Sequence, residues 1–202
     1  MSIPQPDPQV NPRAQHDLLA AAFRDLHGAR LHGFALLVSL GDRQRAAAVS
    51  AEALAAGARR AGELRHPERA AAWLRARTWR RLRGSTSRLR PGTGRERNEA
   101  LRGLGMQPAA LAGLGALSLQ ERTALVAGSI ERLESADLQL VLGTDAAGAR
   151  KLLTRARTRY LAAVLATSEQ RPPSEDVPGS GDLAALVDGI ASRTIGDHGA
   201  LR

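Results

Sequence analysis

Cysteine is missing from this 202-residue chain, and aromatic residues make up only 2% of it. Without thiols the chain has no disulfide framework, no redox pair and no thiolate metal site. The five histidines form no His-x-x-x-His pair around a glutamate, and the chain contains no Ser-centred elbow and no nucleotide-binding fingerprint. We therefore expect no catalytic residue, no metal, no cofactor and no small-molecule substrate.

Long apolar segments are also missing. The sequence contains no run of about eighteen apolar residues, the length that a membrane span needs. Its first residues do not place a basic start before an apolar run, as a signal peptide does. We expect a cytoplasmic protein with no membrane partner, led by a disordered, proline-rich segment over residues 1–14.

Acidic residues are few relative to basic ones. The chain has 29 Lys and Arg against 20 Asp and Glu, a formal net charge of +9 and a pI near 11.4. The excess lies between Arg59 and Arg102, where fourteen arginines accompany four glutamates. The planar fork of arginine suits phosphate and guanine contacts, so this imbalance predicts a nucleic-acid partner. Genomic base composition would explain why Lys151 is the only lysine, but not this local excess.

Helical periodicity, almost without period-two β-branched runs, predicts an all-α chain. We expect two small helical domains joined by a flexible basic linker, the second domain being a helix-turn-helix. The first is expected over residues 15–90, the linker over 91–107 and the second over 108–166. Residues 167–202 are expected to form a further linker and a short tail helix, with an apolar stripe from Leu183 to Ile190.

The first domain shows four helical patterns. Two apolar stripes precede Gly41-Asp42, and an alanine-rich helix is expected over about residues 43–64. Pro67 suits the first turn of a fourth helix. The residues expected on the inner faces of the first two stripes are Leu18, Leu19, Ala22, Phe23 and Leu26, then Leu31, Phe34, Ala35, Leu37 and Val38.

The second domain carries the most informative pattern. Ser118 precedes Glu121 by three residues, which predicts a capping box for a helix toward Leu133. A second helix is expected from Ser135 until Gly143 stops it. A third is expected over about residues 146–161, and its inner positions are Ala149, Leu152, Leu153, Ala156 and Tyr160.

The other faces of that third helix are basic. They hold Arg150, Lys151, Arg155, Arg157 and Arg159, with no acid among them. Two helices joined by a short glycine turn, the second basic and led by small side chains, favour a helix that enters the DNA major groove. The alternative is an amphipathic helix that packs its apolar face and leaves its charges in water.

This half resembles the C-terminal DNA-binding region of the extracytoplasmic-function (ECF) sigma factors of bacterial RNA polymerase. The elements that carry the resemblance are Leu117, Ser118, Glu121-Arg122, Asp137-Leu138, Leu142-Gly143, Arg150 and Arg155-Ala156-Arg157. The chain departs from the family pattern at Gln139 and at Gly148-Ala149. The resemblance implies a DNA-binding recognition helix, and the residues it assigns there are Ala147, Gly148, Arg150, Lys151, Thr154, Arg155 and Arg157.

The first half is similar to the N-terminal region of the same family. The matching elements are Phe23, Gly41-Asp42, Glu52-Ala53 and Ala72-Trp73-Leu74, followed by arginines. In that family one helix binds the polymerase clamp, which implies Ala48, Ala51 and Glu52 here, although the family usually has polar residues at the first two positions. The last helix captures unpaired promoter DNA, which implies Arg77, Trp79, Arg80 and Arg83. The sequence leaves Trp79 open between base stacking and ordinary packing, whereas Trp73 is expected in the core.

These patterns predict a DNA-binding transcription initiation factor that directs core RNA polymerase to promoters. Its expected partners are double-stranded promoter DNA, core RNA polymerase and an anti-sigma factor. Two alternatives stay open. One is a stand-alone helix-turn-helix regulator that no longer binds polymerase, and the other is a protein-interaction scaffold derived from a sigma factor.

Overall fold

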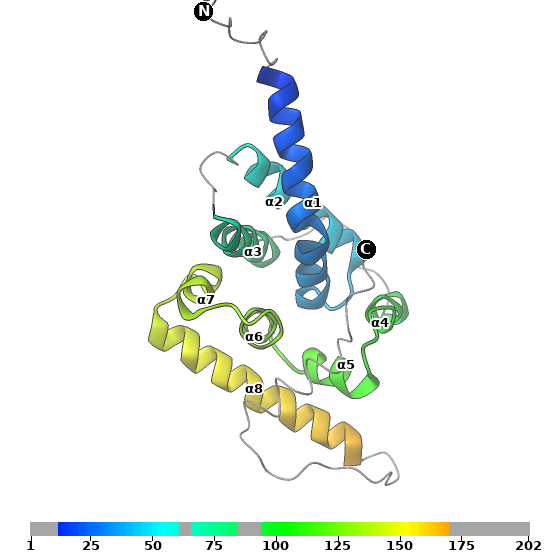
Figure 1. Ribbon diagram of the computed structural model, residues 1–202. Helices are drawn as coiled ribbons and strands as arrows, with labels where there is room; N and C mark the ends of the chain where they lie inside the picture. Colours follow the sequence, from blue (N-terminus) through cyan, green and yellow to red (C-terminus); the bar gives the residue numbers. More distant parts are fainter. Residues whose placement is uncertain (1–11, 61–65, 85–93, 170–202) are drawn as a thin grey trace, which may run out of the picture.

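The computed structural model describes residues 12–60, 66–84 and 94–169. All regular structure in these residues is helical, which confirms the predicted all-α class. In chain order the elements are α1 (Pro12–Val38), α2 (Arg43–Ala58), α3 (Pro67–Gly84), α4 (Gly94–Arg102), α5 (Pro108–Gly115), α6 (Leu119–Leu125), the π-helical turn η1 (Val126–Ile130), α7 (Ser135–Leu142) and α8 (Ala146–Glu169) (Figure 1). No helix among these combines the length and apolar character that a bilayer span requires. Most of the predicted lead and the predicted tail helix lie outside the described residues.

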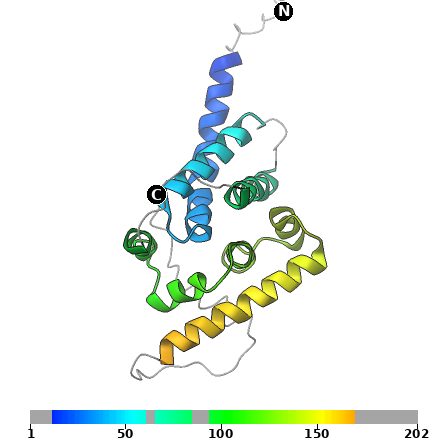
Figure 2. The ribbon, with the colours of Figure 1, turned by 180° about the vertical axis from the view of Figure 1, so that it is seen from behind.

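The helices form layers that can be followed from both sides (Figures 1 and 2). The N-terminal part of α1 projects beyond the body, and α2 and α3 pack beside its other part. Helices α6 and α7 form the middle layer, between α3 and the long α8. Helices α4 and α5 lie at the side of the molecule away from α3 and α7.

Helix α1 runs without a break through both predicted apolar stripes. Its C-terminal part is core, since Leu31, Phe34 and Val38 are at most 1% exposed. Leu18 and Leu26, predicted on the inner face, are instead 70% and 60% exposed. The reason is that α2 meets the projecting part at Phe23, whose ring lies against Gly57.

The turn after α1 depends on a glycine. Gly41 has φ +78, and a Cβ there would lie 2.2 Å from the Arg97 carbonyl oxygen, so both the backbone conformation and the space require glycine. Asp42 then caps α2 by accepting a hydrogen bond from the Arg45 backbone N–H at 3.0 Å. Helix α2 ends at Ala58, before the predicted limit near residue 64.

The core is continuous between the two predicted domains. A small cluster joins α1, α2 and α3 through Phe23, Leu31, Leu54 and Leu74. A larger cluster contains side chains from both halves, among them Phe34, Val38, Leu82, Leu101, Leu125, Val126, Tyr160 and Val164. The described residues of the two predicted domains therefore share a core cluster, and the structure does not confirm the predicted pair of separate domains.

The segment predicted as a flexible linker, residues 91–107, contains helix α4. Ala100 and Leu101 bury the inner face of this helix. The Arg97 side chain donates hydrogen bonds to the carbonyl oxygens of Leu40, at 3.0 Å, and Ser39, at 3.2 Å. These contacts hold the segment against the end of α1, and the surrounding glycines, which indicated flexibility, conceal this short amphipathic pattern in the sequence.

A titrating residue in the small cluster generates a prediction. His27 is buried against Phe23, with ring centroids 4.7 Å apart, and its pKa is lowered from 6.5 by burial and then by Arg75 and Arg30. The folded protein thus binds fewer protons than the unfolded chain just below that pH, so stability present above pH 6.5 is lost on acidification.

We predict that the free energy of unfolding decreases between about pH 7.5 and about pH 5.5, and decreases less in His27→Gln. Urea unfolding of both proteins at the two pH values measures the difference. Equal decreases in the two proteins would contradict the assignment to His27. Because other groups titrate equally in both, the comparison isolates this histidine.

Candidate nucleic-acid interface

The predicted capping box at Ser118 and Glu121 is confirmed. The Glu121 backbone N–H donates to the Ser118 hydroxyl at 3.3 Å, and the Ser118 backbone N–H donates to the Glu121 carboxylate at 2.9 Å. The reciprocal bonds fix the start of α6 and turn the carboxylate back toward Ser118. Glu121 is only 2% exposed, which makes it a buried charge at the helix start.

The helix predicted to run to Leu133 changes to a π-turn after Leu125. The Glu131 backbone N–H donates to the Val126 carbonyl at 2.9 Å, and Arg132 then takes φ 53, unusual for a residue with a side chain. Gly128 lies half-buried in this turn, where a Cβ would come within 2.8 Å of the Leu153 side chain. The glycine therefore lets α8 pack closely over η1.

Helices α7 and α8 are joined by the expected short glycine turn. Gly143 ends α7 with φ 66, and Asp145 caps the start of α8 by accepting from the Gly148 backbone N–H at 2.7 Å. A Cβ at Gly148 would lie 2.4 Å from the Thr144 hydroxyl oxygen, so a larger residue here would require the Thr144 side chain to move. Helix α7 begins at Ser135, as predicted, and Glu134 is its N-cap residue.

The inner face of α8 follows the predicted spacing. Ala149, Ala156 and Tyr160 are at most 2% exposed. Tyr160 packs over Gly113 of α5, where a Cβ would lie 2.6 Å from the ring. Helix α8 continues past the predicted limit to Glu169, and Val164 extends its buried face.

The opposite face of α8 offers two basic side chains near the helix start. Arg150 and Lys151 are exposed, as are Ala147 and Thr154. Neither basic residue makes a hydrogen bond or an ion pair with another described residue. They are two exposed cations on the outer side of a helix whose inner side is packed against the core.

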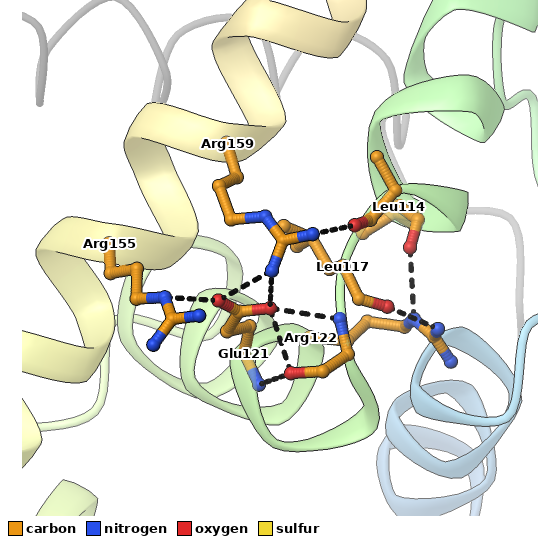
Figure 3. Close-up of polar contacts among 8 residues, drawn as sticks. Leu114, Leu117, Glu121, Arg122, Arg155 and Arg159 are labelled. Atoms are coloured by element: carbon orange, nitrogen blue, oxygen red, sulfur yellow. Dashed lines mark hydrogen bonds and ion pairs between the residues drawn. The ribbon is translucent and has the colours of Figure 1, made fainter.

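The predicted contact residues farther along α8 have internal partners (Figure 3). Arg155 lies 2.8 Å from the Glu121 carboxylate, and Arg159 lies 2.9 Å from it. Arg157 donates to the buried hydroxyl of Ser129 at 3.0 Å. Arg155 and Arg157, predicted on the recognition helix, thus also join α8 to α6 and to η1.

Burial opposes the charge of Glu121, but its hydrogen bonds from Ser118 and the Arg159 guanidinium outweigh that effect. Together they hold the pKa of Glu121 below its usual range. The carboxylate therefore stays charged and keeps both arginines of α8 directed toward it, as Figure 3 shows. Arg155 remains 67% exposed along its side chain, so its far guanidinium edge still faces solvent.

The four residues predicted to capture unpaired DNA lie on α3 but differ in exposure. Arg80 and Arg83 are exposed, and Arg77 is half-buried and 3.7 Å from Glu52. Trp79 is only 2% exposed, so of the two roles that the sequence left open the structure shows packing. Trp73, predicted in the core, is the half-buried tryptophan, with guanidinium groups of Arg60 and Arg77 at 5.6 and 5.7 Å from its ring.

The predicted polymerase contacts lie together on α2. Ala48 and Ala51 are exposed, which leaves a smooth helical surface. Glu52 is half-buried, and its carboxylate lies 2.6 Å from the Arg81 Nε. The acidic candidate is thus already paired with α3.

Two long-range contacts escape the sequence patterns. Arg122 is 7% exposed and donates to three carbonyl oxygens, of Leu114, Leu117 and Val38. Burial and then Arg97 lower its pKa to about 10. Arg75 pairs with Glu131, 56 positions away. The sequence analysis singled out the Glu121-Arg122 motif but predicted no partner for Arg122.

Comparison of the chain with models of known families, with curated proteins and with solved structures finds no match.

We predict that Glu121→Gln lowers the free energy of unfolding by about 1–3 kcal/mol, since it weakens one buried acceptor for two partly exposed arginines. The lowered pKa means that this stabilisation is present at neutral pH and is lost as pH falls below the ordinary value of 4.5. Urea unfolding at neutral and acidic pH measures both effects. Glu134→Gln is the matched control on an exposed residue, and an equal loss in the two variants contradicts the prediction.

Proposed function

We propose that this chain is a DNA-binding transcription initiation factor of the ECF sigma type, in which α7 and α8 act as a helix-turn-helix. The observation that carries the proposal is the pair of exposed cations Arg150 and Lys151 near the start of α8, which have no carboxylate partner among the described residues. A recognition helix contacts base edges with its N-terminal residues, while the helix before it crosses the DNA backbone. The two cations stand in the first turns of α8, where such contacts are made.

The backbone of the turn supports this role. Gly143 and Gly148 give α7 and α8 a tight connection, and Ala147 adds little bulk to the exposed side. The helix start also carries the positive end of the helix dipole, which favours a nearby phosphate. Arg150 is able to make a bidentate contact with guanine, and Lys151 a point contact with phosphate.

Helix α3 would supply the contact to unpaired DNA. Arg80 and Arg83 are exposed near its end, on the chain segment with the largest positive excess. Neither is paired with a carboxylate among the described residues. Such arginines attract a phosphate backbone independently of base sequence.

One observation favours the stand-alone DNA-binding regulator as a second candidate. The surface of α2 that would bind polymerase offers methyl groups at Ala48 and Ala51, and Glu52 is engaged by Arg81. A contact that loses its polar partners is weaker, because the partner's own groups are left without hydrogen bonds. Duplex binding without polymerase binding is the property that separates the two candidates.

We expect the double variant Arg150→Ala/Lys151→Ala to weaken binding to duplex DNA by at least about tenfold. The magnitude of the slope of log affinity against log salt should fall by about 2. On a random duplex both cations contact phosphates, and binding releases about one counterion fewer for each contact that is lost. Fluorescence anisotropy with a labelled random duplex, at several salt concentrations, measures both values.

The matched control is Arg43→Ala/Arg59→Ala, which removes the same charge from exposed arginines at the two ends of α2. Any effect of net charge alone appears equally in both double variants. Unchanged duplex binding by the α8 variant, or an equal loss in the control, excludes α8 as the DNA-reading helix.

The polymerase contact is tested by size-exclusion chromatography of the protein with bacterial core RNA polymerase at about micromolar concentration. An initiation factor comigrates with the enzyme, and Ala51→Trp on the exposed surface of α2 abolishes comigration by steric conflict. Ala162→Trp, on the exposed side of α8, is the control. Separate elution of the wild type, with duplex binding intact, identifies the stand-alone regulator.

A further inference from the structure

Helix α3 is buried on two opposite sides. Ala70 and Leu74 face the small cluster formed with α1 and α2. At about 100° per residue, Ala72, Ala76 and Trp79 fall on the other side of the helix, and all three are at most 2% exposed. The two ribbon views place α7 alongside α3, between α3 and α8 (Figures 1 and 2). The C-terminal half therefore covers the α3 face that carries Trp79.

An ion pair fastens this contact. Arg75 lies on the covered side of α3, one turn before Trp79, and its side chain is 6% exposed. Its guanidinium binds both carboxylate oxygens of Glu131, with Nη2 2.6 Å from Oε1 and Nε paired to Oε2. A forked pair of this kind fixes orientation as well as distance. Glu131 reaches its partner from the strained connection between η1 and Arg132, where the backbone is irregular.

The contact between α3 and α7 combines an ion pair with small side chains on α3. Ala72 and Ala76 bury little apolar area, so Trp79 is the main apolar side chain of this α3 face that separation of the two helices would expose. A buried ion pair adds little net stability, because both charges regain hydration when the surfaces part. Separation also returns Arg75 and Glu131 to water without leaving a lone charge buried.

Separation would expose a surface with the chemistry that single-stranded DNA requires. Trp79 has the Arg83 guanidinium 6.0 Å from its ring centroid, and Arg80 is the next residue. Aromatic faces beside guanidinium groups stack unpaired bases and hold their phosphates. In the closed arrangement the arginines are exposed but the stacking surface is not.

We propose that α7, latched by the Arg75 and Glu131 ion pair, masks a single-strand binding face of α3, so that this protein captures unpaired DNA only after the latch opens. The inference rests on the proposed DNA-binding function and adds its regulation. The apparent affinity for the single strand is the intrinsic affinity multiplied by the fraction of molecules that are open. Raising the open fraction tenfold therefore raises the apparent affinity about tenfold.

The test uses Trp73→Phe as the parent protein, which leaves Trp79 as the sole tryptophan. Glu131→Gln removes the charge and preserves the shape of the side chain. We expect acrylamide quenching of Trp79 to rise several-fold, and affinity for a labelled oligothymidylate of about 20 nucleotides to rise about tenfold. Binding to duplex DNA through α8 should be unchanged. Glu134→Gln is the control, and far-UV circular dichroism checks that each variant keeps its helices.

Two further variants assign the effect. Trp79→Leu in the Glu131→Gln protein should abolish the gained single-strand affinity. The charge exchange Arg75→Glu/Glu131→Arg should restore low quenching and weak single-strand binding, because the ion pair is re-formed in reverse. If the increase in single-strand affinity persists in Trp79→Leu, the binding face lies elsewhere and the proposal is overturned.

The remaining outcomes are distinguishable from failure of the proposed function. Quenching that stays low in Glu131→Gln shows that the ion pair is no latch, and increased quenching without increased single-strand affinity shows that the covered face is no DNA site. Both overturn the inference, while duplex binding that still depends on Arg150 and Lys151 leaves the helix-turn-helix role intact. Absent duplex binding in the wild type contradicts the proposed function itself.

Discussion

The buried guanidinium of Arg122 is the contact on which the arrangement of the helices depends. Among the residues that the structure describes it pairs with no carboxylate, and it donates instead to the carbonyl oxygens of Leu114, Leu117 and Val38. Carbonyls at helix ends lack partners within their own helix and carry partial negative charge. One side chain thereby joins the end of α5, the turn before α6 and the end of α1. Its removal would leave three carbonyl groups without a donor inside a packed core.

Glu121, the residue before Arg122, joins α6 to the helix on its other side, α8. Glu121 caps its own helix through Ser118 and holds Arg155 and Arg159 of α8. Two adjacent, oppositely charged residues thus anchor α6 to elements on both sides, as Figure 3 shows. Because these contacts occupy the middle of α8, its free cations are concentrated near its start, at Arg150 and Lys151. The electrostatic character of the candidate interface is therefore a consequence of internal pairing.

The arginine-rich segment that follows residue 59 likewise contains both internally paired and exposed arginines. Arg75 and Arg97 make internal contacts, to Glu131 and to the end of α1, whereas Arg80 and Arg83 remain exposed. A count of charges in the sequence therefore overestimates the number of arginines that a phosphate backbone can contact. The arginines that hold the two halves together also determine which aromatic surface is covered.

Local patterns were sufficient to predict the all-α class, the capping box at Ser118, the Gly143 turn and the inner positions of α8 up to Tyr160. Periodicity and capping act over a few residues, so a pattern within one helix suffices to predict them. The burial of Trp79, the helix within the predicted linker and the partners of Arg155 and Arg157 depend on long-range packing. Each of these depends on which distant surface meets the residue, as when Glu131 pairs with Arg75, and no spacing along the chain specifies that pairing.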